Sequence, residues 1–304
     1  MLSSEAAAAI ARMLEARAET VVRPGASSLA DERANWEAAE LAEPLPAGAR
    51  SFRVDAGGVP AEWVSMPGSR PGRAFFLLHG GGYNSGSCVT HRRLAAEIAR
   101  HTQLQVLTPD YRLAPEHPFP AAVDDALMAW RWLLEQGYSA KGIVVGGDSA
   151  GGGLALSMLL SLREANLALP RAAVLMSPWT DLTVALPSHE TMRARDAMLT
   201  QEALIVAADW YARGRLNDPV VSPVLADLRG LPPLLIHVGG DEVLLDDSRV
   251  LAQRARDAGV TVNYKSWLGL WHVFHSAAPN VPESVQALVE IAAFIRSQFG
   301  DQVR

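Results

Sequence analysis

The sequence contains very little cysteine and no surplus of positive charge. Its 304 residues include one cysteine, Cys88, so no internal disulfide can form and the hydrophobic core has to hold the fold. Lysine and arginine number 27 against 33 aspartates and glutamates, which gives a net charge of −6. Because a nucleic-acid-binding protein needs a basic surplus or a basic stripe, we expect no nucleic-acid partner.

Long apolar runs and targeting signals are also missing. No apolar run approaches the ~18 residues that a membrane span requires. The first residues carry no basic region, and the apolar run at residues 6–11 is interrupted by Arg12 before it reaches the length of a signal peptide. No cysteine–histidine cluster has zinc-site spacing. We therefore expect a cytoplasmic protein with no membrane span and no metal.

Apolar residues are plentiful, at 49% of the sequence against 20% charged, which suffices for a large core. After a predicted hairpin at 52–55 and 61–65, short apolar runs with glycine or proline nearby indicate buried parallel strands at 74–78, 105–107, 143–145, 172–176 and 234–238. Amphipathic stretches between and after them predict helices at 92–100, 121–135, 154–163, 248–258 and 284–299. Strands that alternate with helices predict an α/β fold built from right-handed βαβ units.

Two segments do not follow this alternation. Residues 1–45 read as two helices, of which the second begins at a capping box formed by Ser28 and Asp31. Residues 181–230 hold a helix-like stretch at 201–213 and several proline-containing turns. We interpret both segments as a cap over one end of the sheet, within a single domain that spans residues 1–304.

The strongest local pattern is G-x-S-x-G, formed by Gly147, Ser149 and Gly151 between an apolar strand and a helix-compatible run. A nucleophilic serine needs this strand–turn–helix context because a tight turn exposes its Oγ, and the glycines let strand and helix pass closely. The alternative is a glycine-rich phosphate-binding turn. A P-loop would require a lysine that this turn lacks.

A second glycine-rich loop follows the predicted strand at 74–78. It reads His79-Gly80-Gly81-Gly82, and glycine allows the backbone to approach a substrate closely. We expect the N–H groups of Gly81 and Gly82, with that of Ala150, to stabilise an oxyanion. The alternative is a flexible glycine loop with a structural histidine.

An acid and a base are expected after the serine, in that order. Asp241 follows the strand at 234–238 and a Gly-Gly turn, and His272 follows the predicted strand at 262–267. Side chains at these strand ends meet the serine at the carboxyl edge of the sheet. We expect His272 to take the proton from Ser149 and Asp241 to orient His272.

Other acids and bases lie close by in the sequence. Asp246 and Asp247 compete with Asp241, which we prefer because it directly follows the strand and its turn. His275 competes with His272, and the two together have the spacing of a helical metal pair, although no third ligand with a family spacing is visible.

In combination these patterns resemble a known family, the hormone-sensitive-lipase branch of the bacterial α/β-hydrolase esterases. The resemblance covers about residues 50–300 and rests on the following motifs: His79-Gly80-Gly81-Gly82, Asp110-Tyr111-Arg112-Leu113-Ala114-Pro115-Glu116-His117-Pro118-Phe119-Pro120-Ala121-Ala122, Gly147-Asp148-Ser149-Ala150-Gly151-Gly152, Ser177-Pro178-Trp179, Asp241 and Trp271-His272-Val273-Phe274. It implies an α/β-hydrolase fold with a mostly parallel sheet of about eight strands and a helical cap.

The resemblance also implies hydrolysis of short- to medium-chain carboxylic esters through an acyl-serine, without cofactor or metal. It carries the catalytic triad over as Ser149, Asp241 and His272. The sequence departs from the family at Glu242, where many members have proline after the acid. Some relatives prefer lactones, others have lost catalysis and bind ligands, and a peptidase or amidase is a further alternative. A homodimer through the strand at 262–267 is also a candidate.

The cap is expected to set the chain-length preference. Aromatic candidates for the substrate pocket are Tyr83, Trp179, Trp210 and Tyr211, together with Trp36. For each of them, packing in the core is the alternative. Cys88 lies a few residues after the glycine-rich loop, so we expect it to be a point of thiol sensitivity and not a catalyst.

Overall fold

The computed structural model describes residues 2–22 and 28–301, without the side chains of residues 17–22. Its strands are β1 (Arg50–Asp55), β2 (Pro60–Ser65), β3 (Ala74–Leu78), β4 (Gln105–Pro109), β5 (Ile143–Asp148), β6 (Ala172–Met176), β7 (Leu234–Gly239) and β8 (Val262–Trp267). They form one eight-stranded sheet in the order β1-β2-β4-β3-β5-β6-β7-β8, antiparallel at β1–β2 and β2–β4 and parallel elsewhere. This confirms the predicted α/β-hydrolase fold class.

The central strands are apolar because helices cover both of their faces. Every residue of β3, β5, β6 and β7 is buried, which explains why their sequences run as solid apolar blocks. In the parallel register, Leu78 at the end of β3 lies opposite Gly147 near the end of β5. The loops that follow these two strands therefore begin side by side at the carboxyl edge of the sheet.

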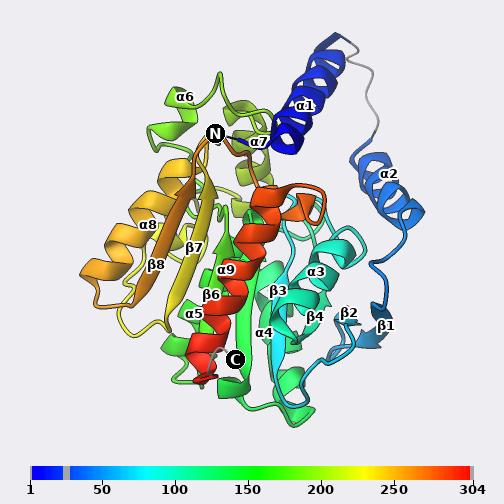
Figure 1. Cartoon of the computed structure of the whole chain (residues 1–304). Helices are drawn as coiled ribbons and strands as arrows, with labels where there is room; N and C mark the ends of the chain where they lie inside the picture. Colours follow the sequence, from blue (N-terminus) through cyan, green and yellow to red (C-terminus); the bar gives the residue numbers. More distant parts are fainter. Residues whose placement is uncertain (1, 23–27, 302–304) are drawn as a thin grey trace.

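Two helical layers sandwich this sheet (Figure 1). One apolar cluster joins α4 (Ala121–Glu135), α5 (Ala150–Glu164) and α8 (Leu245–Asp257) to one face. A second cluster joins α3 (Arg92–Thr102) and α9 (Pro282–Phe299) to the other face. Short 3-10 helices are η1 (Ala140–Gly142), η2 (Pro223–Leu225) and η3 (Phe274–Ala277).

The N-terminal helices lie outside the two layers. Helix α1 (Ser4–Val22) packs on the segment that follows β8, where Ala6 joins a small apolar cluster with Trp271 and Phe274. Helix α2 (Leu29–Ala42) begins at the predicted capping box, since Ser28 and Asp31 exchange hydrogen bonds. None of the residues of α2 is buried.

The inserted segment contains α6 (Ser188–Thr191) and α7 (Gln201–Ala212). Figure 1 shows α1, α6 and α7 at the same end of the molecule, beyond the carboxyl ends of the parallel strands. The division into one domain with a two-part cap stays a prediction, and residues 23–27 of that cap lie outside the described residues.

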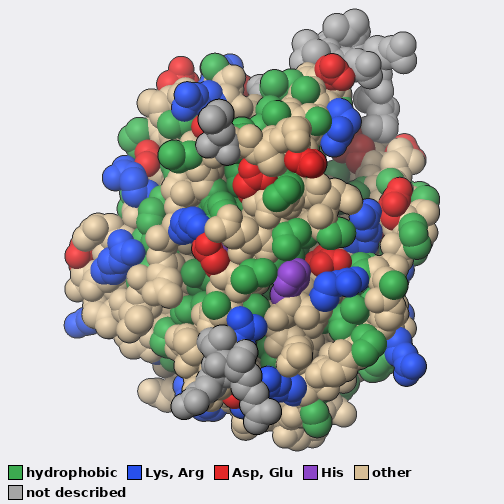
Figure 2. Space-filling view, in the orientation of Figure 1, with side chains coloured by type: hydrophobic (Ala, Val, Ile, Leu, Met, Phe, Trp, Pro, Cys, Tyr) green, Lys and Arg blue, Asp and Glu red, His purple; other side chains and the backbone are tan. Residues whose placement is uncertain are grey.

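On the face drawn in Figure 2, acidic and basic side chains are interspersed, with apolar side chains between them. Among the described residues, no helix is both long and apolar enough to cross a membrane.

Candidate active site

Ser149 occupies a strained turn between β5 and α5. Its backbone has φ 52° and ψ −125°, a conformation that a non-glycine residue rarely adopts. The turn is held because the Ser149 N–H donates to the carbonyl oxygen of Met176 at 3.0 Å, and the Ser149 carbonyl accepts from the N–H of Trp179 at 2.9 Å. Ser149 is also the N-cap of α5, so the positive end of the helix dipole lies next to its side chain.

The glycines around Ser149 are required by close packing of backbone on backbone. A Cβ on Gly147 would lie 2.3 Å from the carbonyl oxygen of Gly151, and one on Gly151 would lie 2.0 Å from that of Leu78. A Cβ on Gly153 would lie 2.2 Å from the carbonyl oxygen of Trp179. A side chain at any of these three glycines would therefore collide with backbone.

The glycine-rich loop after β3 lies beside this turn. Gly81 and Gly82 have φ of 112° and 62°, and a Cβ on Gly81 would lie 2.3 Å from the carbonyl oxygen of Ser85. Gly81, Gly82 and Ser149 line one cavity. Ala150 is the first residue of α5 and is buried, so its backbone N–H lies at the helix N-terminus directly after the serine.

His79, the first residue of this glycine-rich loop, is held in place by contacts with Tyr111 and Gly80. Its ring stacks on Tyr111 with centroids 4.0 Å apart, and the Tyr111 hydroxyl donates to the His79 carbonyl oxygen at 2.7 Å. Its Nδ1 lies 2.8 Å from the carbonyl oxygen of Gly80. Burial lowers the pKa of His79 to about 4, so the ring is neutral at neutral pH and Nδ1–H donates to that carbonyl.

His272 is held by a buried carboxylate, that of Glu242. His272 Nδ1 lies 2.6 Å from Glu242 Oε2, and Glu242 Oε1 accepts from the Ser177 hydroxyl at 2.6 Å and the Gly239 N–H at 2.5 Å. Both side chains of the pair are buried. Burial by itself would lower the pKa of His272, but the negative charge of Glu242 outweighs it and the pKa is raised.

The expectation that Asp241 orients His272 is thereby corrected. Asp241 lies at the surface, where its Oδ1 is 3.5 Å from Arg195 Nη1. Its backbone N–H donates to Leu270, so the main chain at Asp241 and not its side chain faces the His272 loop. The turn after β7 directs the second of the two adjacent acids inward. The sequence indicates only that an acid follows the strand end, and it does not distinguish Asp241 from the adjacent Glu242.

The competing residues have other partners. Asp247 accepts from the backbone N–H groups of Thr180 and Asp181, both at 2.8 Å. Asp246 accepts from the Ser188 N–H at 3.0 Å and from Arg249. His275 is buried with its ring against His237. No group of three or more metal-ligating side chains is arranged for an ion among the residues that the structure describes.

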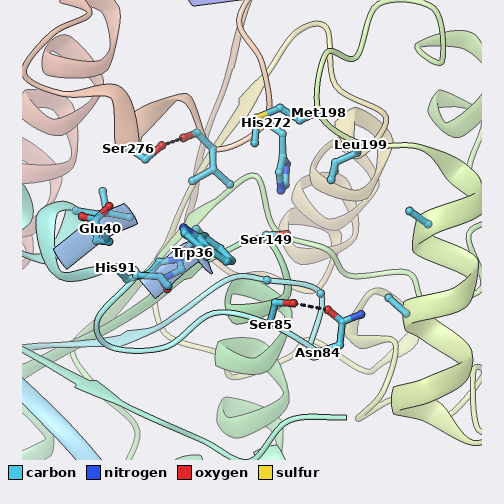
Figure 3. A pocket seen from close by; sticks show the side chains of 18 of the residues that line it. Trp36, Glu40, Asn84, Ser85, His91, Ser149, Met198, Leu199, His272 and Ser276 are labelled. Atoms are coloured by element: carbon cyan, nitrogen blue, oxygen red, sulfur yellow. Dashed lines mark hydrogen bonds and ion pairs between the residues drawn. The ribbon is translucent and has the colours of Figure 1, made fainter. Parts of the chain in front are cut away.

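A cavity of about 610 Å³ lies between these loops, α2 and α7 (Figure 3). The structure gives its lining as Trp36, Glu40, Gly81, Gly82, Asn84, Ser85, Thr90, His91, Arg93, Leu94, Asp148, Ser149, Met198, Leu199, Ala203, Leu204, Ala207, His272, Val273 and Ser276. In Figure 3 the ring of His272 points toward the side of the cavity where Ser149 lies. The serine and the histidine predicted from the sequence thus meet in one cavity.

Most of the aromatic residues predicted for the pocket are placed elsewhere. Tyr83, Trp179 and Tyr211 are buried in the core, where the rings of Tyr83 and Tyr211 stack at 3.8 Å. None of these three residues is among those that line the cavity. Trp210 lines a neighbouring groove of about 380 Å³. Trp36 is the one of the five that lines the cavity itself.

Helix α2 is held at the site by Arg33, a residue that no sequence pattern singles out. The Arg33 guanidinium donates to the carbonyl oxygens of Asn84 at 2.7 Å and Ala114 at 2.8 Å, and its two terminal nitrogens each lie 2.9 Å from a carboxylate oxygen of Glu116. Trp36, one turn further along the helix, is held over the cavity by this anchor.

Comparison with known proteins places the chain in a family. The sequence model of the α/β-hydrolase fold family matches residues 75–276. An acetyl-hydrolase of Streptomyces hygroscopicus is 44% identical over 252 residues, 83% of this chain and 84% of that protein. An esterase of Acinetobacter venetianus is 42% identical over 224 residues, 73% of this chain and 74% of that protein.

A solved structure gives the same result. The crystal structure of an esterase from the bacterial hormone-sensitive lipase family matches with a TM-score of 0.92 at 42% identity, over 99% of this chain and 100% of that one. The match therefore extends over the sheet, the turn that carries Ser149 and the N-terminal helices. The chain belongs to the α/β-hydrolase family, in its hormone-sensitive-lipase branch, and is a carboxylic ester hydrolase.

Proposed function

We propose that ester hydrolysis is carried out by Ser149 as nucleophile, His272 as general base and acid, and Glu242 as the acid that orients His272. One observation carries this assignment: His272 Nδ1 lies 2.6 Å from a fully buried Glu242, while the ring lines the same cavity as Ser149. With Nδ1–H fixed by the carboxylate, Nε2 is the nitrogen left to accept a proton.

In the acylation step, Ser149 Oγ attacks the ester carbonyl carbon and His272 Nε2 takes the hydroxyl proton. The carbonyl oxygen becomes an oxyanion that accepts from the N–H groups of Gly81, Gly82 and Ala150. When the C–O bond breaks, His272 returns the proton to the leaving alkoxide. The products are an alcohol and an acyl-Ser149.

In deacylation, His272 takes a proton from a water molecule that attacks the acyl carbon. A second tetrahedral oxyanion forms in the same place, and its collapse returns the proton to Ser149 Oγ and releases the carboxylic acid. His272 has to be neutral at the start of each half-reaction. Because the pKa of His272 is raised by Glu242, activity should increase with pH through that raised value.

The substrates supported best are esters of short to medium acyl chains. The cavity of about 610 Å³ has a largely apolar wall on α7 and the segment before it, formed by Met198, Leu199, Ala203 and Leu204. The similar protein from S. hygroscopicus carries the name acetyl-hydrolase. Trp36 closes the α2 side of the cavity, which limits the length of chain that fits.

Exchange of Ser149 for alanine tests the proposal. We expect Ser149→Ala to reduce kcat on p-nitrophenyl acetate by at least ~10⁴-fold and to abolish labelling by a fluorophosphonate. The matched control is Ser161→Ala, the same substitution on α5, where the hydroxyl donates to the Ser157 carbonyl. More than a tenth of the wild-type kcat in folded Ser149→Ala protein would refute the assignment.

A further inference from the structure

His91 is a buried histidine in the cavity that the proposed mechanism does not use. It directly precedes α3, in the segment that follows the glycine-rich loop at residues 79–82. Its Nε2 lies 3.2 Å from Asp148 Oδ2, and its Nδ1 lies 2.8 Å from the Thr90 hydroxyl oxygen. The ring is only 5% exposed and lines the cavity.

The partner of His91, Asp148, links the two loops that are proposed to carry the reaction. Asp148 directly precedes Ser149, and its Oδ1 accepts from the backbone N–H of Gly80 at 3.2 Å. Gly80 in turn directly precedes Gly81. The packing is tight, since a Cβ on Gly80 would lie 2.2 Å from Asp148 Oδ2. One buried carboxylate therefore fixes the spacing between the nucleophile turn and the oxyanion loop.

The hydrogen-bond partners of His91 allow a proton on each ring nitrogen. The Gly80 N–H has two acceptors within reach, His91 Nε2 at 3.1 Å and Asp148 Oδ1 at 3.2 Å. When it donates to the carboxylate, Nε2 can carry a proton and donate to Asp148 Oδ2 at 3.2 Å. The Thr90 hydroxyl lies 2.9 Å from the Ser87 carbonyl oxygen, and when it donates there, Nδ1 has to donate to Thr90. Both ring nitrogens then carry protons, and His91 is an imidazolium.

The charges around His91 favour this form. The groups that face it are His79 and Gly80 at the end of β3, Asp148 at the end of β5, Trp36 and Glu40 on α2, and Ser87 and Thr90 in its own loop. Burial would lower the pKa of His91, but the Asp148 carboxylate outweighs it and the pKa is raised. Burial would likewise raise the pKa of Asp148, but His91 outweighs it and the pKa is lowered.

We propose that His91 is a positioning residue for ester hydrolysis: as an imidazolium it neutralises Asp148, so that this carboxylate can hold the oxyanion loop against the nucleophile turn without opposing the oxyanion. The inference rests on the proposed roles of Ser149 and of Gly81 and Gly82. It gives His91 an effect on the transition state although it touches no reacting atom.

The proposal has a consequence for pH dependence. A histidine with a raised pKa keeps its proton at neutral pH and loses it as the pH rises through the folded value. Asp148 is then a buried, unpaired negative charge next to the developing oxyanion. Activity should therefore rise with pH as His272 becomes neutral and fall again as His91 loses its proton, which gives a bell-shaped profile.

The test compares His91→Gln, His91→Leu and the control His101→Gln by kcat, KM and pH profile on phenyl acetate. Glutamine can still donate to Asp148 but does not titrate, whereas leucine cannot donate. His101 lies on α3, the helix that His91 precedes, and outside the lining of the cavity. For His91→Leu we expect kcat to fall ~10-fold or more with KM nearly unchanged, below the ~10²–10³ that loss of an oxyanion donor costs.

For His91→Gln we expect partial recovery of kcat and loss of the descending limb of the pH profile, with His101→Gln like wild type. A descending limb that is still present in the pH profile of His91→Gln overturns the proposal. A His91→Leu variant in which only KM changes also overturns it, because a residue that merely packs against Trp36 would act on substrate binding. If His91→Leu does not fold, the presence or absence of the descending limb in the pH profile of His91→Gln decides whether the proposal stands. A wild-type protein that neither turns over esters nor is labelled by a fluorophosphonate would instead refute the proposed function.

Discussion

Exchange of Glu242 for glutamine is the most discriminating change in the proposed triad. In the structure, Glu242 Oε1 accepts from two donors, the Ser177 hydroxyl and the Gly239 N–H, whereas Oε2 faces His272 Nδ1. A glutamine has one carbonyl oxygen, and the two donors draw it to the Oε1 position. Its NH₂ group then faces His272 and forces Nδ1 to become an acceptor.

This reversal places the single ring proton of a neutral His272 on Nε2. Nε2 then cannot accept the hydroxyl proton of Ser149. In a serine triad, the same change of tautomer reduces kcat by about 10⁴. Each tenfold loss corresponds to 1.36 kcal/mol, so the expected rise of the barrier is about 5 kcal/mol. The neighbouring exchange Asp241→Asn removes only an exposed ion pair with Arg195, which contributes about 0–1 kcal/mol to stability and nothing to the tautomer.

The assay measures kcat for both variants on p-nitrophenyl acetate after circular dichroism has shown that each is folded. We expect a loss of ~10⁴ for Glu242→Gln and a wild-type rate for Asp241→Asn. Nitrogen NMR of His272 reports the tautomer directly. Retention of more than a tenth of the rate in Glu242→Gln, or a loss of 10²-fold or more in Asp241→Asn, would refute this reasoning about the acid.

Two further predictions concern other residues near the site. The thiol sensitivity expected of Cys88 is corrected by its surroundings: Cys88 is buried beside Asp110 and Glu62, and burial together with the Asp110 charge raises its pKa. We expect alkylation by iodoacetamide to be more than ~100-fold slower in the native protein than in urea, and rapid native labelling with loss of activity would contradict this. For Trp36→Ala we expect the ratio of kcat/KM on octanoate to that on acetate esters to rise by ~10-fold, because the cavity opens on the α2 side; an unchanged ratio would show that Trp36 does not limit chain length.

The sheet could be predicted closely from the sequence because its strands are buried on both faces. Ala74–Leu78 and Ala172–Met176 are strands with the predicted bounds, since each solid apolar block is directly followed by a polar residue, His79 or Ser177, which leaves little choice of ends. The start of α5 was predicted four residues too late, at 154, whereas the helix begins at Ala150. Glycine lowers helix propensity, and the glycines at 151–153 are present for the close packing of the turn.

Site residues could be predicted from the sequence where a backbone pattern defines their position. They could not be predicted where the role depends on the direction in which a side chain points. Ser149 and His272 follow strand ends and meet in the cavity. The choice between Asp241 and Glu242 depends on which side chain the turn directs inward, and adjacent acids look equivalent in a sequence. Tyr83 follows the oxyanion loop but has φ 61°, which turns its side chain into the core. Arg33 acts through contacts with residues far away in the sequence, which no local pattern reveals.

Helix α2 has a consequence for how new specificities can be engineered. It contributes Trp36 and Glu40 to the cavity, yet none of its residues is buried. Substitutions at such surface positions usually change the free energy of unfolding by no more than about 0.5 kcal/mol, whereas a side chain at Gly151 would collide with backbone 2.0 Å away. If Arg33 is kept, libraries of variants on the cavity side of α2 can explore new substrates while the catalytic turn and the thermal stability stay as they are.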